Sequence, residues 1–253
     1  MDLYHWEPTT NSGEVLILLE EKGLQFAGHY VDVLAFEQHD PAFLEINPQA
    51  QVPVLVHDGR TITETGFILQ YLEAAFPEPS FTPRAAQDRY WVNVWIKYVN
   101  EYLAPAAWRL GAHATRAQLQ ARATPQGRAG LKRAPLERQQ AWSKVLDEGF
   151  SADDLDIARA LLPIRLDHME QALSMSDWLA GAAYSLADIA VYPTAASLPA
   201  LAPDLVNPAS TPRIMAWLDR VKARPAVQAA LAAARTPDPT AIFAPGPEGS
   251  RWG

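Results

Sequence analysis

The chain has 253 residues, of which 49% are hydrophobic and 20% charged, a composition that excludes a mainly disordered or collagen-like protein. It contains no cysteine, which excludes disulfides, thiolate metal sites and a cysteine nucleophile, so any sulfur chemistry must come from a bound thiol. The 29 acidic and 21 basic residues give a formal charge of −8, which argues against nonspecific nucleic-acid binding.

The segment Met1–Glu7 has neither a basic region nor a long apolar core, and no apolar run in the chain approaches the ~18 residues that a membrane span requires. We therefore expect a cytoplasmic protein with no membrane partner and no nucleic-acid partner. The length, at roughly 150 residues per domain, allows one large domain or two small ones.

Strand and helix signals alternate over the first 76 residues. Leu3–Trp6 is a short apolar run that predicts a strand, and the turn cluster Pro8–Gly13 is rich in residues that cap helices. The apolar run Val15–Leu19 then predicts a helix, with Gly23 just beyond its end. Phe26–Val33 predicts a second strand, which would lie parallel to the first after the helical crossover.

A hairpin is predicted after residue 50. Val52–His57 and Thr61–Thr63 flank the dipeptide Asp58-Gly59, which is a strong hairpin signal between two β-branched runs. A helix from Glu64 to Ala75 follows and is ended by Pro77. The predicted order is therefore βαβ followed by ββα.

Almost everything after residue 85 has helical spacing, and a cluster of prolines precedes it. We divide the chain into an amino-terminal domain, a linker, an all-helical domain with a long insertion, and an extended tail; their bounds are 1–77, 78–85, 86–235 (insertion 109–150) and 236–253. Capping boxes predict helix starts at Ser151–Asp154 and Ser185–Asp188. Thr211-Pro212 predicts a third start, with proline at the first helical position.

The insertion is basic. Between Arg109 and Lys144 there are eight basic residues and one acid, Glu137. Its weak periodicity, with Pro125 and Gly127 among its helix breakers, predicts a partly irregular segment. A charge run of this kind is typical of a solvated face.

Four aromatic residues share one predicted helical stripe: Trp91, Trp95, Tyr98 and Tyr102 follow one another at i, i+4, i+7 and i+11. Such a stripe is typical of a core or a subunit interface, and it also fits a wall of a substrate pocket.

Two dipeptides carry candidate binding chemistry. Val52-Pro53 is either a plain strand start or a cis turn, and a cis turn leaves the Val52 backbone free to pair with an extended peptide. Glu64-Thr65 is either an ordinary helix cap or a site for a zwitterion. In the second reading the helix N-terminus and Thr65 take an α-carboxylate while Glu64 takes an α-ammonium.

In this order and spacing the segments resemble the cytosolic glutathione transferase superfamily over nearly the whole chain. The segments that carry the resemblance are the start ending Glu21-Lys22-Gly23, Asn47-Pro48 to Val52-Pro53, Glu64-Thr65, the proline linker and the box Ser185-Leu186-Ala187-Asp188-Ile189. The resemblance implies an α/β thioredoxin-like amino-terminal domain, an all-α helical carboxy-terminal domain, glutathione as cosubstrate bound mainly by the former, and no metal.

Within the superfamily the sequence is similar to the bacterial lignin β-etherases, which cleave β-aryl ethers with glutathione. The segments that carry this likeness are the long insertion, Phe36-Glu37-Gln38-His39, Asn47-Pro48, Gln51-Val52-Pro53, His57-Asp58-Gly59, Ala216-Trp217-Leu218-Asp219-Arg220 and Ala223-Arg224-Pro225. The likeness implies a glutathione thiolate that displaces a phenolate from the carbon next to a ketone in lignin-derived aromatics.

The resemblance also implies roles for single residues. Positions expected to bind glutathione are Gln38, His39, Gln51, Val52, Pro53, Glu64 and Thr65. Glu64 and Thr65 would hold the γ-glutamyl end, and Val52 would pair with the cysteinyl backbone across a cis bond to Pro53. Gln38 and His39 are candidates for the glycyl carboxylate, although His39 also fits a plain surface histidine.

The resemblance to the lignin β-etherases also implies that the residue activating the thiol lies near the start of the first helix. Ser12 is the first choice and Asn11 the second, with Thr9 and Thr10 as competing hydroxyls. Each can donate a hydrogen bond to a thiolate, and the helix N-terminus adds partial positive charge. Each also fits simple helix capping.

The acceptor pocket is expected between the domains, because junctions favour ligand sites and aryl rings stack on aromatic side chains. Its expected lining residues are Trp95, Tyr98, Tyr102 and Trp108. Two other functions remain open: a transferase acting on another electrophile, and a noncatalytic ligand-binding or heterodimer subunit. We expect a dimer, of identical chains or with a related partner.

Overall fold

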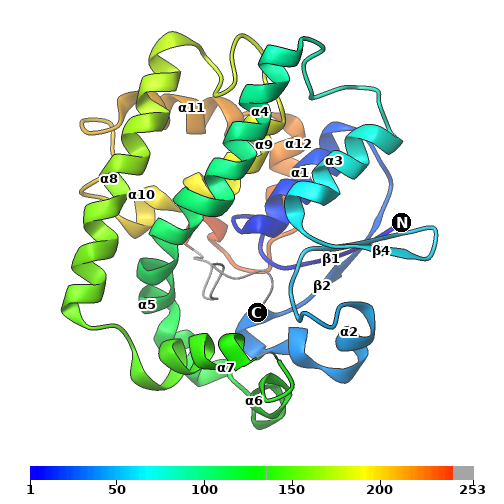
Figure 1. Ribbon diagram of the computed structural model, residues 1–253, viewed down its shortest axis with the longest axis vertical. Coiled ribbons are helices and arrows are strands. Elements are labelled where there is room, and N and C mark those ends of the chain that lie inside the picture. Colours follow the sequence, from blue (N-terminus) through cyan, green and yellow to red (C-terminus); the bar gives the residue numbers. More distant parts are fainter. Residues whose placement is uncertain (135, 242–253) are drawn as a thin grey trace.

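The computed structural model describes residues 1–134 and 136–241. A small sheet with its helices is followed by a larger helical part (Figure 1). The first part contains, in chain order, β1 (Asp2–His5), α1 (Asn11–Glu21), β2 (Ala27–Tyr30), η1 (Val33–Ala35), η2 (Glu37–His39), α2 (Pro41–Ile46), β3 (Val54–His57), β4 (Arg60–Ile62) and α3 (Thr65–Ala75).

The four strands form one mixed sheet in the order β2-β1-β3-β4. β2 is parallel to β1, and β3 is antiparallel to both β1 and β4. The βαβ and hairpin predictions are therefore confirmed. Residue alternation sends Leu3 and Leu55 into the core shared with α1 and α3, whereas Val54 packs on the other face with Phe43 of α2.

The second part is helical. Its elements are α4 (Ala86–Tyr98), η3 (Val99–Leu103), α5 (Ala104–Arg122), α6 (Pro125–Leu131), α7 (Leu136–Ser143), η4 (Lys144–Glu148), α8 (Ala152–Met175), α9 (Leu186–Ala196), α10 (Leu198–Leu201), α11 (Pro212–Lys222), α12 (Pro225–Ala232) and η5 (Pro239–Ala241). Helix α1 of the first part packs against α9 and α12, so one hydrophobic core runs through both parts.

The helix starts that the sequence indicates are confirmed. Ser151 caps α8 and Ser185 caps α9, each in a reciprocal capping box with the aspartate three residues on. Pro212 is at the first position of α11, and Gly23 has a φ of +63° just past α1. Helix α8 continues through Pro163 without interruption.

The basic insertion differs from the sequence prediction, because its described residues are largely helical rather than irregular. Thr124 caps α6, and Pro125 stands at its first position, where a proline is tolerated. The glycines allow close packing: a Cβ on Gly127 would lie 2.5 Å from the Phe36 Cβ, and one on Gly130 would lie 2.6 Å from the His39 carbonyl oxygen. Helix α6 thus sits directly on η2. The predicted extended tail, 236–253, lies mostly outside the described residues.

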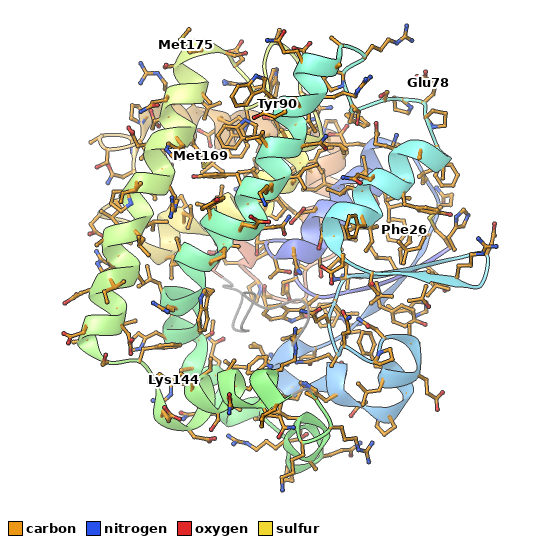
Figure 2. The ribbon with its side chains drawn as sticks, viewed as in Figure 1. Phe26, Glu78, Tyr90, Lys144, Met169 and Met175 are labelled. Carbon is orange, nitrogen blue, oxygen red and sulfur yellow. The ribbon has the colours of Figure 1, made fainter. Side chains whose placement is uncertain are left out.

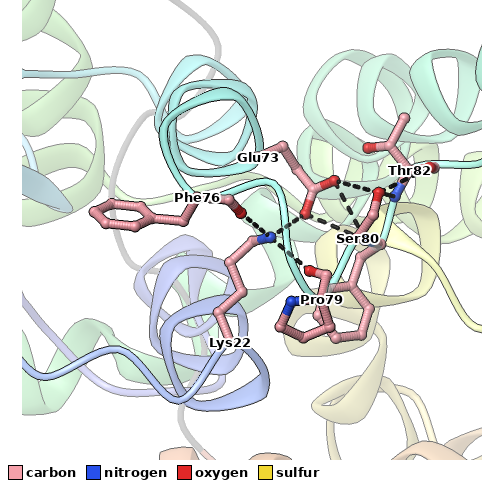
Figure 3. Close-up of polar contacts among 7 residues, drawn as sticks. Lys22, Glu73, Phe76, Pro79, Ser80 and Thr82 are labelled. Atoms are coloured by element: carbon pink, nitrogen blue, oxygen red, sulfur yellow. Dashed lines mark hydrogen bonds and ion pairs between the residues drawn. The ribbon is translucent and has the colours of Figure 1, made fainter.

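The linker is fixed by one buried lysine at the end of α1 (Figure 3). The Lys22 ammonium lies 2.6 Å from the Glu73 carboxylate and donates to the carbonyls of Phe76 and Pro79 at 2.8 and 2.7 Å. Glu73 in turn accepts from the Phe81 backbone N–H at 3.2 Å. The chain that leaves α3 is therefore held against α1 before α4 begins.

Candidate active site

A cavity lies at the junction of the sheet part and the helical part. Its walls on the sheet side are Thr9, Thr10, Asn11, Glu14, Asn47, Gln51, Val52, Pro53, Thr63, Glu64 and Thr65. Its walls on the helical side are Val99, Asn100, Ala104, Ala107, Trp108, Gly111, Thr194, Ser197, Leu198 and Leu201. One side is rich in hydrogen-bonding groups and the other is largely apolar, as expected of a small-molecule site.

The start of α1 faces this cavity through Asn11. Its amide Nδ2 donates to the Val52 carbonyl at 3.1 Å, which leaves the second amide hydrogen for another acceptor. Thr10 is the N-cap: its hydroxyl donates to the Glu7 carbonyl at 2.7 Å and accepts weakly from the Ser12 N–H at 3.4 Å. The partial positive charge of the helix N-terminus is therefore directed at the cavity.

Ser12, the expected thiol-activating residue, is not brought to the cavity. It is fully buried, and its Oγ accepts from the Trp6 backbone N–H at 3.0 Å. The serine side chain points back to the strand side of the loop, where it satisfies a backbone donor that would otherwise be unpaired. Of the four candidates, Thr9, Thr10 and Asn11 line the cavity and Ser12 does not.

The Val52-Pro53 bond is cis, as predicted from the sequence. The preceding turn is held by Asn47, whose Nδ2 donates to the Gln51 carbonyl at 2.9 Å and whose Oδ1 accepts from the Gln49 N–H at 3.1 Å. Gln51, Val52 and Pro53 all line the cavity. Their backbone is thus presented to it in a fixed conformation.

Glu64 begins α3 in an unusual backbone conformation, with φ +66° and ψ 110°. Its carbonyl accepts from the N–H groups of Phe67 and Ile68, both at 2.9 Å, but its side chain does not cap the helix. A positive φ in a residue other than glycine is costly and concentrates at functional sites. Glu64 and Thr65 both line the cavity, so a carboxylate and a hydroxyl stand at a helix N-terminus.

Gln38 and His39, the candidates for the glycyl carboxylate, are buried in η2 and do not line the cavity. Neither ring nitrogen of His39 has a hydrogen-bond partner among the described residues. Burial, with a smaller effect of the Arg138 charge, lowers the pKa of His39 to about 4. The imidazole is therefore neutral near pH 7 and does not bring a positive charge to a carboxylate.

Of the four aromatic residues expected in the pocket, only Trp108 of α5 lines it. Trp95 and Tyr98 are buried in the helical core with ring centroids 5.0 Å apart, and the Tyr98 hydroxyl donates to the Arg165 carbonyl. Tyr102 is exposed, with the Arg165 guanidinium 5.0 Å from its ring. The π-helical turn η3 separates α4 from α5, and across it the Tyr98 and Tyr102 rings stack with their centroids 6.2 Å apart, away from the cavity.

Sequence reasoning missed several polar residues of the cavity. Glu14 is buried in the first turn of α1, three residues after Asn11 and on the same helical face. Thr194 and Ser197 come from the end of α9, and Asn100 comes from the π-helical turn. Helical spacing from Asn11 would have indicated Glu14, whereas only the folded chain brings the other three to the same cavity.

Residues 1–134 and 136–241 contain no group of three or more histidine, aspartate or glutamate side chains placed to hold a metal ion. Among the helices of this part of the chain, none is both long and apolar enough to cross a membrane.

Comparison with known families identifies the fold. The family model described as glutathione S-transferase, N-terminal domain, matches residues 1–74, and the one described as glutathione S-transferase, C-terminal domain, matches residues 134–225. Protein LigF of Sphingobium sp. (strain NBRC 103272 / SYK-6) is 37% identical over 235 residues, which are 90% of this chain and 91% of that protein. The chain belongs to the glutathione S-transferase family, and the expected fold class is confirmed.

Comparison with solved structures also finds proteins of the glutathione transferase fold. The crystal structure of β-etherase LigF from Sphingobium sp. strain SYK-6 matches with a TM-score of 0.85 and 35% identity, covering 91% of this chain and 98% of that one. A glutathione transferase from Burkholderia graminis, crystallised with two glutathione molecules bound per subunit, matches with a TM-score of 0.69 and 27% identity over 92% of this chain and 88% of its own. The expectation of a glutathione transferase is thereby confirmed.

Proposed function

We propose that this enzyme is a β-etherase that uses glutathione to cleave β-aryl ether ketones of the kind found in lignin-derived aromatics. The observation that carries the proposal is the cavity itself, in which a wall rich in hydrogen-bonding groups meets a largely apolar wall with one tryptophan. The likeness to β-etherase LigF over nearly the full length of both chains supports this choice of electrophile.

In this proposal the sheet side of the cavity holds glutathione. The γ-glutamyl end lies at Glu64 and Thr65, where a carboxylate faces the ammonium and the α3 N-terminus faces the carboxylate. The cysteinyl unit pairs with the Val52 backbone beside the cis bond. Gln51 directly precedes Val52 and also lines the cavity. We therefore assign Gln51 to the glycyl end, in place of Gln38 and His39, which are buried and do not line the cavity.

The thiol then lies at the start of α1, beside Asn11. The free amide hydrogen of Asn11 and the helix N-terminus both favour the thiolate over the thiol. The thiolate attacks the carbon that bears the aryloxy group: a C–S bond forms, the C–O bond breaks, and its electron pair leaves with the phenolate oxygen. The adjacent ketone makes this carbon electrophilic, so alignment of the two reactants is the main task of the protein.

The aryl rings of the electrophile belong on the helical side. Trp108 offers a face for stacking, which contributes about 0.5–1.5 kcal/mol for an aromatic pair beyond the buried area. Leu198 and Leu201 of α10 supply the apolar remainder of that wall. A Trp108→Ala variant is therefore expected to raise KM for the ether more than KM for glutathione.

The decisive experiment is turnover of glutathione with a model β-aryl ether ketone, followed by release of the phenol. Phenol release that needs glutathione supports the etherase. Conjugation of an aryl halide without ether cleavage would instead indicate a transferase for another electrophile, and binding of glutathione without either reaction would indicate a noncatalytic subunit.

The glutathione site has its own test. Glu64→Ala is expected to weaken glutathione binding by about 1.5–3 kcal/mol, the range for hydrogen bonds to charged groups. Calorimetry measures this directly, and Glu45→Ala, on the partly buried helix α2 away from the cavity, is the matched control. Equal affinity in Glu64→Ala and the control would contradict the assignment.

We also propose that the enzyme is a dimer, of identical chains or with a related partner. Phe67 of α3 and Tyr90 and Trp91 of α4 are large aromatic side chains exposed to solvent, and Figure 2 labels Tyr90 on α4. Aromatic residues are enriched at subunit interfaces. We call Phe67, Tyr90 and Trp91 the aromatic patch.

A further inference from the structure

The carboxy-terminal end of the described chain returns to the loop in front of α1. Residues 235–240, which follow α12, contact residues 7–11, which connect β1 to α1. In Figure 1 this end of the chain is the red segment beside α10. We call residues 235–240 the strap and residues 7–11 the thiol loop.

The first attachment is the Glu7 carboxylate, which is fully buried. Its Oε1 accepts from the Arg235 backbone N–H at 3.3 Å, and its Oε2 accepts from the Thr236 hydroxyl at 3.4 Å. Oε1 also accepts from the Tyr30 hydroxyl at 2.6 Å, and the Arg235 guanidinium lies 4.2 Å from the Tyr30 ring centroid. A buried carboxylate that loses such partners is strongly destabilised, so Glu7 and the strap stay together.

The second attachment lies two residues further along the thiol loop. The Thr9 hydroxyl donates to the Pro239 carbonyl, so its single proton is committed to the strap. The Thr10 backbone N–H and hydroxyl both donate to the Glu7 carbonyl, at 3.1 and 2.7 Å. Glu7 thus holds the helix cap with its backbone and the strap with its side chain.

We infer that the strap positions the thiol loop for the reaction and that Glu7 is the positioning residue through which it acts. The inference rests on the proposed function, because it places the glutathione thiol at Asn11. The Thr9 hydroxyl donates to the strap and the Thr10 hydroxyl donates to Glu7. Asn11 therefore remains as the side-chain donor of this loop to the thiolate. Small displacements of such a donor reduce the rate substantially.

Within residues 1–134 and 136–241, the strap is attached to the sheet part at the thiol end of the site, through hydrogen bonds to Glu7 and Thr9. A loosened strap should therefore impair chemistry at sulfur while the γ-glutamyl and cysteinyl backbone contacts persist. This separates positioning from a general loss of binding.

The test uses the full chain with glutathione and a model β-aryl ether ketone. Glu7→Gln and Thr236→Val remove the two sides of one attachment, and both are expected to lower kcat by about threefold to tenfold. KM for glutathione should stay within about twofold, because the other contacts remain. The midpoint of the rise of kcat with pH should move to higher pH in both variants, because the thiolate loses its aligned donor.

Two controls accompany these variants. Thr236→Ser keeps the hydroxyl and should restore both kcat and the pH profile. Thr240→Val removes a hydroxyl of the same segment that donates to Asp238, at 2.6 Å, and not to the thiol loop. It should behave as the unaltered enzyme. If Glu7→Gln does not fold, Thr236→Val carries the test, because it leaves the buried carboxylate in place.

The experiment distinguishes a failure of the strap inference from a failure of the proposed function. Suppose that the unaltered enzyme binds glutathione and turns over. Unchanged kcat and an unchanged pH profile in Glu7→Gln and Thr236→Val would then overturn the positioning role of the strap and leave the proposed function standing. A kcat that falls only in proportion to the folded fraction, with no shift of the pH profile, would also overturn it. If the unaltered enzyme does not bind glutathione in calorimetry, the proposed function fails first.

Discussion

Four consecutive polar residues, Thr9 to Ser12, lead into the start of α1 and differ in where their hydrogen-bonding groups point. Thr9 and Thr10 donate to the carbonyls of Pro239 and Glu7, and the Ser12 oxygen accepts from a backbone N–H inside the loop. Asn11 keeps one amide hydrogen free of the bond to Val52 and lines the cavity. The structure therefore favours Asn11 over Ser12 as the thiol donor.

This difference gives a paired prediction. Asn11→Ala should raise the pKa of bound glutathione and lower kcat by about tenfold, because a hydrogen bond to a charged group is lost. Ser12→Ala should instead lower stability by about 1–3 kcal/mol, because the Trp6 N–H loses its buried acceptor. Thiolate absorbance against pH and thermal unfolding measure the two effects. Lost turnover with unchanged stability in Ser12→Ala would return the role to the serine.

The lowered pKa of His39 predicts how the stability of the fold depends on pH. Its pKa is lowered to about 4 by burial and by Arg138, whereas an unfolded histidine titrates near 6.5. Between these values the unfolded chain binds more protons, so stability falls as the pH is lowered from about 6.5 to 4, by up to about 3 kcal/mol. His5 contributes in the same direction, because burial also lowers its pKa.

Urea unfolding at several pH values tests the contribution of His39. A His39→Gln variant, which does not titrate, should lose most of this dependence relative to the unaltered chain. A variant with the same slope of stability against pH would show that His39 is not the group responsible.

At the scale of elements, sequence signals predicted the structure correctly where a residue makes its structural contacts within its own turn or helix cap. Asp58-Gly59 predicted the β3–β4 hairpin, and Ser185 with Asp188 predicted the start of α9, because turn and cap chemistry is complete within four residues. Asp188 does more than this: its Oδ1 also accepts from the Trp217 indole at 2.9 Å, a contact that no local pattern indicates.

The predictions that failed at this scale depended on distant partners. The sequence pattern predicts that Gly127 breaks a helix, whereas Gly127 and Gly130 allow α6 to approach η2, some ninety residues earlier in the chain. The aromatic stripe was expected to line the pocket, whereas Trp95 and Tyr98 pack in the helical core and Tyr102 stacks on Tyr98, with ring centroids 6.2 Å apart. Helical periodicity places residues on one face, but it does not indicate which part of the fold covers that face.

The lysine that fixes the linker gives a prediction for this scale. Lys22→Met should lower stability by about 3–5 kcal/mol, because the partly buried Glu73 carboxylate loses its fully buried counter-ion. Lys97→Met is the matched control, since Lys97 pairs with Glu101 on an exposed helix surface and such pairs contribute about 0–1 kcal/mol. Chemical denaturation compares the two variants, and equal losses would contradict a structural role for the buried lysine.

At the scale of the whole molecule, the cavity exists only because two parts of the chain meet. The sequence indicated the cis turn at Val52-Pro53 and the helix start at Glu64, since both are local features, and both positions line the cavity. The opposite wall combines Trp108 of α5 with the ends of α9 and α10, about ninety residues later. That wall follows from packing of helices, so its residues other than Trp108 could be named only in the folded chain.

The last prediction concerns association of whole molecules through the aromatic patch. Its three side chains are 48–60% exposed, and the Tyr90 and Trp91 ring centroids lie 5.2 Å apart. The start of α3 packs closely on α4, since a Cβ on Gly66 would lie 3.3 Å from the Ile96 side chain. Phe67 and the two α4 aromatics therefore come from neighbouring helices, and covering them in a dimer removes apolar area from water.

Replacing Phe67 and Trp91 together by glutamate should convert the dimer to a monomer, because two charges cannot be buried in an apolar interface without partners. Light scattering over a range of concentrations measures the mass, and near-ultraviolet circular dichroism shows whether each chain stays folded. Leu136→Glu is the control: Leu136 is 62% exposed but lies on α7, at the opposite end of the molecule from α4 in Figure 1. A folded double variant that remains dimeric would show that the chains associate through another surface.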